Sequence, residues 1–324
     1  MNNFLYQAQL IEDIISNQKL TELKKDYKNI SLKYRKENIN SSTVVSSKNQ
    51  ALSYVSSRMP ETSVIIDSVL DKINQLIDIK TEIQSVIDLG SGTGSALWAL
   101  ENYVDKIDVF AVEKQEPMIK YSKELSKNLD LNISYIQEDV LSEKVEKLNS
   151  ADLVLESFML NEMNAKDRTQ TLDLMIKKAN KYIVLIEPGT PVSYQKMMQD
   201  RAYLLSKDLQ LVLPCMHNKN CPLKDDYCNF TVRVNRTKAL KQIKEGLLGY
   251  EDEKYFYLVF SKEEIQKDFN SIVIRKPVYR KSCIDLKLCK GDATIQNTTI
   301  TKNNKQNYAK AKDLKHGDLF NLNI

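Results

Sequence analysis

The stretch VIDLGSGTGSALWAL, residues 86–100, is typical of a strand that ends in a glycine turn and leads into a helix. The chain has eight glycines, and three of them, Gly90, Gly92 and Gly94, lie in this turn. Glycine allows the backbone to turn tightly and to approach a ligand closely. Because Asp88 ends the strand, the pattern is D-x-G-x-G-x-G rather than the G-x-G-x-x-G of dinucleotide-binding loops. The stretch therefore predicts a ligand-binding loop at the end of a strand.

Short apolar runs alternate with helical patterning from residue 85 to residue 187. Near-continuous apolar runs of this kind predict a parallel sheet with helices on both faces. Five such units predict a doubly wound, Rossmann-like α/β fold. The predicted strands cover residues 85–89, 107–112, 133–136, 152–156 and 182–187.

The rest of the chain is arranged around this core. We expect residues 1–80 to form an N-terminal helical region, residues 81–208 the Rossmann-like core, and residues 209–324 a cysteine-rich insertion, the final strands and a basic tail. The polar segment 38–50 predicts a loop or a weakly ordered link. Three later stretches are expected to be the last antiparallel strands of the same sheet, with the cysteine cluster inserted ahead of them and Cys289 closing the final strand. These stretches cover residues 255–262, 282–289 and 294–302.

The glycine loop resembles motif I of the class I S-adenosylmethionine-dependent methyltransferases. That resemblance implies S-adenosylmethionine as a cofactor. Glu113, at the end of the second strand, would accept hydrogen bonds from the ribose hydroxyls, and Asp139, after the third strand, would reach the adenine amine. Ligands of such sheets bind at the carboxyl ends of the strands, where these residues lie. A domain that binds another nucleotide, or no ligand, is the alternative. The predicted cofactor-binding residues are Asp88, Gly90, Gly92, Gly94, Glu113 and Asp139.

The sequence leaves catalysis open. Methylation of exocyclic amines usually needs a (D/N/S)-P-P-(Y/F/W) loop after the fourth strand, but residues 156–163 read ESFMLNEM, without proline. No cysteine lies near this strand to act as a nucleophile. Glu156, Asn161, Glu162 and Glu187 are candidates either for acid, base or orienting groups or for the polar lining of a pocket. We therefore assign no catalytic residue.

Residues 214–230, PCMHNKNCPLKDDYCNF, place Cys215, Cys221 and Cys228 within fourteen positions of a chain that has five cysteines. The N-terminus carries no signal-peptide pattern, and no run of about 18 apolar residues predicts a membrane span. We expect a cytoplasmic, reducing location, which argues against disulfides and favours a metal. The spacing leaves the metal open between zinc, held with His217, and an iron–sulfur cluster held with a more distant cysteine.

Several blocks carry a more specific resemblance. They are PCMH…CPL…YCNF, GYEDEKYFYLVFS (249–261), ALSYVSSRMPET (51–62) and IEPGTP (186–191). They resemble blocks of the methyltransferase-like family of mitochondrial small-ribosomal-subunit proteins and their bacterial relatives. The resemblance implies a 4Fe–4S cluster, with Cys283 as the substitute fourth ligand and His217 as a neighbour. The implied ligands are Cys215, Cys221, Cys228 and Cys289.

Charge is unevenly distributed along the chain. The net charge is +4, but residues 275–324 carry eleven Lys and Arg against four Asp and Glu. Such a basic tail predicts contact with phosphates, although an ordinary solvated face is an equal alternative. Six lysines after Cys289 are candidates for contact with the phosphates of ribosomal RNA: Lys290, Lys302, Lys305, Lys310, Lys312 and Lys315.

The resemblance implies a protein that associates with the small ribosomal subunit and its rRNA and supports subunit assembly or translation. We expect a methyltransferase of the class I fold, and the sequence leaves open whether it transfers methyl groups or has little or no turnover. An active S-adenosylmethionine-dependent rRNA methyltransferase with a purely structural metal site is the first alternative. A zinc-stabilised methyltransferase of small molecules, without an RNA partner, is the second. No membrane partner is expected.

Overall fold

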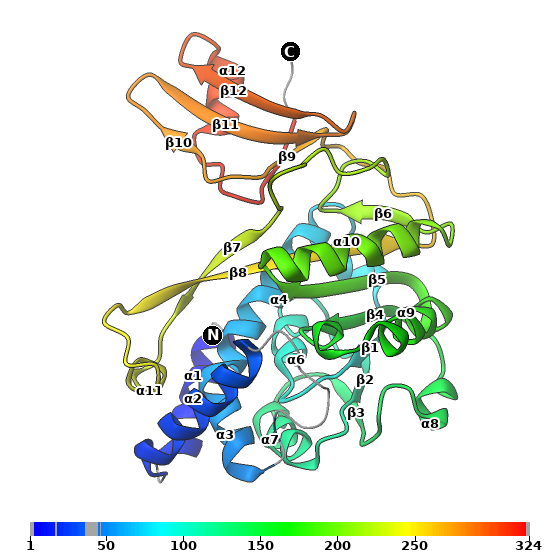
Figure 1. Cartoon of the computed structure of the whole chain (residues 1–324), viewed down its shortest axis with the longest axis vertical. Coiled ribbons are helices and arrows are strands. Elements are labelled where there is room, and N and C mark those ends of the chain that lie inside the picture. Colours follow the sequence, from blue (N-terminus) through cyan, green and yellow to red (C-terminus); the bar gives the residue numbers. More distant parts are fainter. Residues whose placement is uncertain (1–2, 17, 36–44, 46, 322–324) are drawn as a thin grey trace. The chain divides into compact units, whose positions relative to one another are not determined.

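The computed structural model describes residues 3–16, 18–35, 45 and 47–321. The chain forms two compact units. Unit 1 contains Met1–Asp71, Asp78–Ile183 and Val232–Glu253, and unit 2 contains Lys72–Ile77, Val184–Thr231 and Lys254–Ile324. Figure 1 shows the elements along the chain. Each unit draws on several segments of the chain, and the division into three consecutive segments stays a prediction.

A parallel sheet forms the centre of unit 1, with the strand order β3-β2-β1-β4. In β1 the residues from Val86 to Leu89 are all buried, as a strand covered on both faces requires. The register places Asp88 opposite Ala111 of β2 and Leu155 of β4. These strands confirm four of the predicted runs: β1 (Ser85–Leu89), β2 (Asp108–Val112), β3 (Asn132–Ile136) and β4 (Ala151–Ser157).

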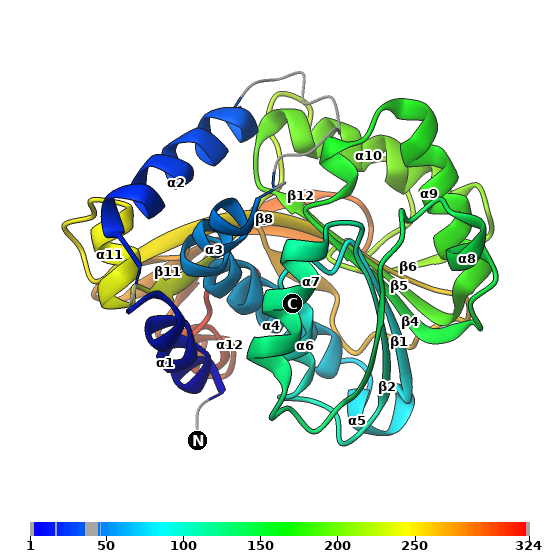
Figure 2. The same ribbon diagram turned by 90° about the horizontal axis from the view of Figure 1, so that it is seen from below.

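Helices connect the strands of unit 1 and cover both faces of its sheet. Figure 2 shows α6 and α7 on one face and α9 on the other. Amphipathic packing of this kind explains why apolar strands alternate with helical patterning in the sequence. The connecting helices are α6 (Ser95–Leu100), α7 (Glu116–Ser126), α8 (Glu143–Glu146) and α9 (Ala165–Lys178).

The N-terminal helices of unit 1 bury their apolar sides together with Trp98 of α6 and Met118 of α7. Residues 47–50 illustrate a local signal, because the Ser47 side chain accepts from the Gln50 amide and caps α3. Most of the predicted polar link, residues 38–44 and 46, lies outside the described residues. The helices are α1 (Asn3–Ile15), α2 (Leu20–Arg35), α3 (Lys48–Ser57), α4 (Met59–Asn74) and α5 (Ile79–Glu82).

Residues 232–253, here called the arm, complete unit 1. The arm contains most of β7 (Phe230–Asn235), α11 (Lys238–Ile243) and the start of β8 (Tyr250–Ser261). Thr237 caps α11 by accepting from the Leu240 amide. Buried residues of α11 join the same apolar core as the N-terminal helices.

Unit 2 contains strands in the order β5-β8-β6. The first residues of β5 and β8 belong to unit 1 and the remaining ones to unit 2. β6 pairs antiparallel with β8, with Gln210 opposite Ser261. In β8 every residue from Tyr255 to Ser261 is buried. The remaining elements here are β5 (Ala179–Pro188), which confirms the fifth predicted run, α10 (Pro191–Leu205) and β6 (Gln210–Leu213).

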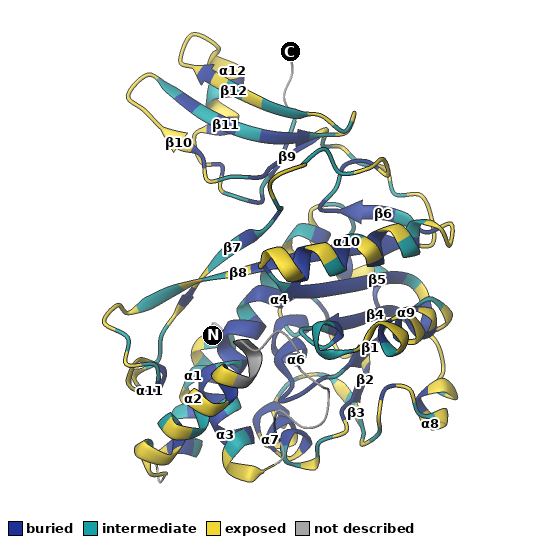
Figure 3. Cartoon of the chain, viewed as in Figure 1, coloured by how far each residue is buried: buried dark blue, intermediate teal, exposed yellow. Residues whose placement is uncertain are grey.

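A second sheet lies at the C-terminal end of unit 2, and it corrects one prediction. Of the three later stretches, the first lies in β8 as far as residue 261. The stretches 282–289 and 294–302 belong instead to this separate antiparallel sheet, of order β10-β11-β9-β13 with β12 on β11. Burial gives the reason, because β11 alternates between buried and half-buried residues and so has only one core face (Figure 3). Cys289 lies in β11 and is followed by two more strands, so it does not close the final strand. The elements are β9 (Ser271–Val273), β10 (Val278–Tyr279), β11 (Cys283–Lys290), β12 (Ile295–Thr301), α12 (Lys305–Ala311) and β13 (Leu319–Phe320).

A search of the described residues finds no helix with the length and apolar character that crossing a bilayer requires.

Candidate functional site

The glycine loop between β1 and α6 needs glycine at each of its three positions. Gly90, Gly92 and Gly94 have φ angles of 72°, 54° and 85°, in the left-handed region that side chains disfavour. A Cβ on Gly90 would lie 2.7 Å from the Met159 sulfur, and one on Gly94 would lie 2.5 Å from the Ser122 hydroxyl. The loop is therefore closely packed as well as tightly turned.

Glu113, just after β2, is bonded to this loop. Its Oε2 accepts from the Gly92 amide at 3.1 Å, and its Oε1 accepts from the Gln115 amide at 2.7 Å. Burial raises the pKa of Glu113, while these amide hydrogen bonds oppose the shift. Each carboxylate oxygen keeps a second lone pair, so Glu113 retains acceptor capacity for a ligand.

Asp88, at the end of β1, is buried beside the same loop. It is 1% exposed, and neither carboxylate oxygen has a hydrogen-bond partner among the described residues. Burial, followed by the charge of Glu113, raises its pKa to about 7. A buried carboxylate without a donor is costly when it is ionised, so this position favours a proton or a donor from a ligand.

A cavity opens beside the loop at the carboxyl ends of β1, β2, β3 and β4. Its volume is about 130 Å³, smaller than the roughly 300–1,000 Å³ of typical small-molecule sites. The structure brings four of the six predicted residues to this cavity, whereas Asp88 and Gly94 do not line it. The predicted residues on its wall are Gly90, Gly92, Glu113 and Asp139.

Asp139 lies at the exposed side of the cavity. Its side chain is 57% exposed, and Lys114 approaches it to 3.8 Å. Its Oδ1 also accepts from the Leu141 amide at 3.1 Å. Asp139 is thus held in place by the turn after β3 and keeps a free edge toward solvent.

The segment after β4 forms another wall of the cavity, through Ser157, Phe158 and Met159. Glu156 shapes this turn, because its Oε2 accepts from the amides of Met159 and Leu160 at 3.3 Å each. Phe158 has a φ of 60°, a strained value for a bulky residue that often marks a ligand site. Of the acid–base candidates only Glu162 lines the cavity; Glu187 lies in unit 2, and Asn161 is not on the wall.

Sequence reasoning missed Tyr54, a cavity residue of α3. Burial, followed by the charge of Glu162, raises the pKa of Tyr54 to about 12, so its hydroxyl stays protonated. Tyr54 is the tyrosine of ALSYVSSRMPET, a block that stood out in the sequence only by resemblance. That block was the available signal, but nothing in its spacing connected it with the glycine loop.

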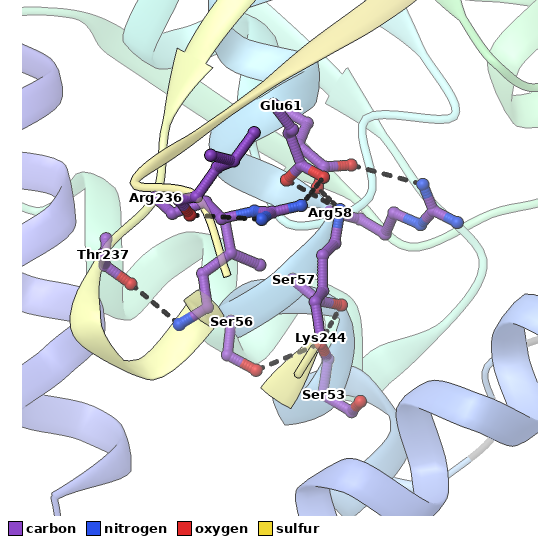
Figure 4. Close-up of polar contacts among 11 residues, drawn as sticks. Ser53, Ser56, Ser57, Arg58, Glu61, Arg236, Thr237 and Lys244 are labelled. Atoms are coloured by element: carbon purple, nitrogen blue, oxygen red, sulfur yellow. Dashed lines mark hydrogen bonds and ion pairs between the residues drawn. The ribbon is translucent and has the colours of Figure 1, made fainter. Parts of the chain in front are cut away.

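A buried ion network ties the arm to α4. Glu61 is 2% exposed, and its carboxylate contacts the Lys244 ammonium and, at 3.2 Å, the Arg58 guanidinium. Lys244 also binds Oε1 of Glu251 at 2.9 Å, and Arg236 binds Oε2 at 2.9 Å. Figure 4 shows the side chains of Arg58, Glu61, Arg236 and Lys244. The network gives a structural reason for part of the block GYEDEKYFYLVFS.

The same place contains an acidic cluster, formed by Glu61, Glu251 and Glu253, whose carboxylate oxygens lie within 4.8 Å of one another. The Lys244 ammonium already contacts two of these carboxylates. The cluster is therefore better described as part of the ion network than as a metal site.

In unit 2 the four cysteines predicted as metal ligands line one small cavity. Tyr194 donates to the Cys221 sulfur at 3.2 Å. Arg201, which is buried, donates to the carbonyl oxygens of His217 at 2.9 Å and Lys219 at 2.8 Å and so holds the loop after the first cysteine. The cysteines are Cys215, Cys221, Cys228 and Cys289.

Burial dominates the chemistry of these thiols. It raises the pKa of Cys215 and Cys228, and burial with the neighbouring cysteines raises the pKa of Cys289 to about 12. The thiols of Cys215, Cys228 and Cys289 are therefore protonated near neutral pH, and a bound metal would displace their protons. Among the described residues no three of these sulfurs and the histidine nitrogens lie within 4.8 Å of one another. A tetrahedral zinc site with Zn–S bonds of about 2.3 Å needs sulfurs roughly 3.8 Å apart, so this arrangement is wider than zinc requires.

His217 and Cys283, the two alternative ligands, differ in position. His217 lines the cysteine cavity, with its Nδ1 3.1 Å from the Lys219 carbonyl oxygen and its Nε2 3.9 Å from the Cys289 sulfur. Cys283 lies six positions before Cys289 on β11 and is not on the cavity wall. Cys289, and not Cys283, is thus the fourth cysteine on the wall of this cavity.

One family model covers the glycine loop, the arm and the four clustered cysteines. A family model described as mitochondrial small ribosomal subunit Rsm22 matches residues 48–321. The chain belongs to the Rsm22 family. This membership confirms the resemblance predicted from the sequence.

Among curated relatives, this Rsm22-family chain is similar to the human protein named ribosome assembly protein METTL17, mitochondrial. The two are 25% identical over 261 residues, which cover 73% of this chain and 55% of METTL17. The chain thus spans about half the length of that relative.

Two solved methyltransferases illustrate the similarity in structure. A magnesium protoporphyrin IX methyltransferase from Synechocystis PCC 6803, solved with bound SAM, has a TM-score of 0.42 and 12% identity, covering 79% of this chain and 97% of that one. A precorrin-6y C5,15-methyltransferase from Geobacter metallireducens has a TM-score of 0.41 and 14% identity, covering 63% and 89%. At these TM-scores the likeness carries no conclusion about function.

Proposed function

We propose that this Rsm22-family protein associates with the small ribosomal subunit and supports its assembly, and that it binds S-adenosylmethionine and a 4Fe–4S cluster. The observation that carries the proposal is the family match over residues 48–321, which includes both the glycine loop and the four clustered cysteines. The name of the human relative, a ribosome assembly protein, agrees with this role.

The residues of the glycine loop support S-adenosylmethionine as the ligand. The positive charge of its ammonium group would favour the ionised form of Asp88, which is buried beside the loop without a hydrogen-bond donor among the described residues. Glu113 would accept from ribose hydroxyls with the lone pairs that its two amide hydrogen bonds leave. Asp139, at the exposed side, is assigned to the adenine, and Gly90, Gly92 and Gly94 allow the backbone to approach the ligand.

The cysteine cavity supports a 4Fe–4S cluster over zinc. Cys215, Cys221, Cys228 and Cys289 line one small cavity, and their sulfurs are spread more widely than a zinc ion requires. Thiolate ligation is the usual way in which proteins hold such clusters. When bound, the cluster would connect the loop of residues 215–228 to β11 and so stabilise unit 2.

The proposed activity is cofactor binding with little or no methyl transfer. Glu156 is committed to the turn after β4, and Phe158 and Met159 present apolar groups to the cavity. Turnover with rRNA as the methyl acceptor is the alternative, for which Tyr54 and Glu162 would be the polar groups on the wall. The cytoplasmic location expected from the sequence stays a prediction, since the relative's name is that of a mitochondrial protein.

Co-sedimentation of the purified protein with small ribosomal subunits tests the proposed role. Binding that weakens as salt is raised, with no binding to large subunits, is expected. Failure to bind small subunits at any stage of their assembly would overturn the proposal. Incubation with labelled S-adenosylmethionine and precursor subunits decides the alternative, because stoichiometric labelling of rRNA would establish turnover.

A further inference from the structure

The second sheet of unit 2 has one buried face and one open face. Ile284, Leu286 and Leu288 of β11 join the buried apolar cluster that includes residues of α12. The alternating residues of β11 point to the other side, where Asp285 lies opposite Thr299 of β12. This other side is hereafter called the open face. Near Cys289 the loop of residues 215–228 covers it, and Asp226 of that loop contacts Lys287 at 3.5 Å, whereas the part around Asp285 is not covered by α12.

A shallow groove on the open face is rich in cations. Polar side chains of β12 form its far side, and no aromatic side chain is among the described residues that line it. The cations on its wall are Arg275, Lys276, Arg280 and Lys287. The polar residues are Asp285, Asn297, Thr298 and Thr299.

Carboxylates neutralise only part of this charge. Asp226 is shared between Arg275 at 2.5 Å and Lys287 at 3.5 Å. Asp285 pairs with Arg280 at 2.8 Å. Lys276 is exposed and has no ion pair within the described part of the chain. Four cations therefore face two carboxylates, and the groove keeps an excess of positive charge.

We propose that this open face binds the phosphate backbone of a helical RNA segment. The proposal rests on the proposed function, since it names the part of the molecule that would meet the RNA of the small subunit. Clustered Lys and Arg side chains contact phosphates without reading sequence. Single-stranded RNA is usually held by stacking on aromatic side chains, which the lining of this groove lacks. A-form helices are instead recognised through phosphates and 2′-hydroxyls, and Asn297, opposite Lys287 in the register, supplies a polar group for the latter.

The basic residues outside the groove provide a matched control. Lys305 and Lys310 belong to α12, which packs on the buried face, and both are exposed. They belong to the same basic region, residues 275–324, as the groove cations and carry the same charge, but they lie on the opposite side of the sheet. If total charge alone determined RNA binding, both sets would matter equally.

Fluorescence anisotropy with an arbitrary RNA duplex of about 16 base pairs tests the assignment on the full-length protein. The double substitution Lys276→Glu/Arg280→Glu should weaken binding by at least about tenfold and reduce the slope of log affinity against log salt by about 1 to 2. Asp285→Asn, which removes a carboxylate from the groove, should tighten binding. Lys305→Glu/Lys310→Glu should change the affinity less than about twofold.

Equal losses in the groove and control variants would overturn the proposal, and so would tighter binding of the single strand than of the duplex. Because Asp285→Asn is expected to gain affinity, misfolding cannot imitate its effect. Co-sedimentation separates this proposal from the proposed function. Groove variants that still bind small subunits with wild-type affinity would reject the groove alone, whereas a wild-type protein that binds no subunit would reject the function.

Discussion

The Gly92 amide donates a hydrogen bond of 3.1 Å to the carboxylate of Glu113, so the loop after β1 and the acidic residue after β2 hold each other. The two residues are 21 positions apart and meet because parallel strands end at the same edge of the sheet. The contact orders the candidate cofactor cavity before any ligand is present. It also predicts that changes in the glycine loop affect stability and ligand binding together.

Gly90→Ala should destabilise the protein by about 1–3 kcal/mol, because the new Cβ would meet the Met159 sulfur and the φ of 72° disfavours a side chain. Urea unfolding measures the change in the free energy of unfolding. Gly249→Ala is the control, since a Cβ there meets no atom within 4 Å. Equal stability of the two variants would contradict this account of the loop.

Asp88 should make the stability of the ligand-free protein depend on pH. Its pKa rises from 3.8 to about 7 on folding, so the folded state retains a proton that the unfolded state has lost. Stability should therefore fall as pH rises from about 4 to about 7, and Asp88→Asn should remove this part of the fall. Thermal unfolding at several pH values measures how stability changes with pH. If Asp88→Asn showed the same change as the wild-type protein, other groups would be responsible for it.

S-adenosylmethionine should release protons when it binds near pH 7, because its ammonium group favours the ionised form of Asp88. Calorimetry in buffers of different ionisation enthalpy measures this release, which should be smaller in Asp88→Asn. If the wild-type protein and Asp88→Asn released the same number of protons on binding, Asp88 would not be the group that responds to the ligand.

Cys221→Ser should abolish the brown colour and visible absorption of protein purified without oxygen, because it removes one of the four thiols around the cavity. Cys283→Ser should retain both, since Cys283 is not on the cavity wall. Metal analysis completes the test. A colourless wild-type protein that contains one zinc ion would reject the cluster.

Lys244→Ala should destabilise the protein by about 3 kcal/mol or more, because it leaves the buried Glu61 carboxylate and Glu251 without their shared ammonium. Arg233→Ala removes an ion pair whose side chains are 56% and 46% exposed, so it should cost no more than about 1 kcal/mol. Urea unfolding compares the free energies of unfolding of Lys244→Ala and Arg233→Ala directly. Similar losses would show that the network of the arm contributes no more than a surface pair.

Local patterns in the sequence predicted much of the fold and of the loop site. Continuous apolar runs predicted β1 to β5, because a strand covered on both faces needs apolar side chains at every position. Three glycines after Asp88 predicted the loop, because left-handed backbone favours glycine. Family membership was also visible in short blocks of residues.

Other features depended on contacts between distant residues. Asn161 and Glu162 are neighbours in the chain, yet only Glu162 lines the loop cavity. Tyr54 joins that cavity from α3, which no local pattern connects with the glycine loop.

The sequence by itself determined the parallel strands, the glycine loop and the gathering of three cysteines, because strand periodicity, backbone preference and residue spacing are local properties. Only the tertiary structure decided that β11 and β12 form a separate sheet and that Cys289, rather than Cys283, completes the cysteine cavity. The two cysteines are six positions apart, so they lie on the same side of β11 but about 20 Å from each other. Which one meets the other thiols depends on how that strand packs, and no local pattern records it.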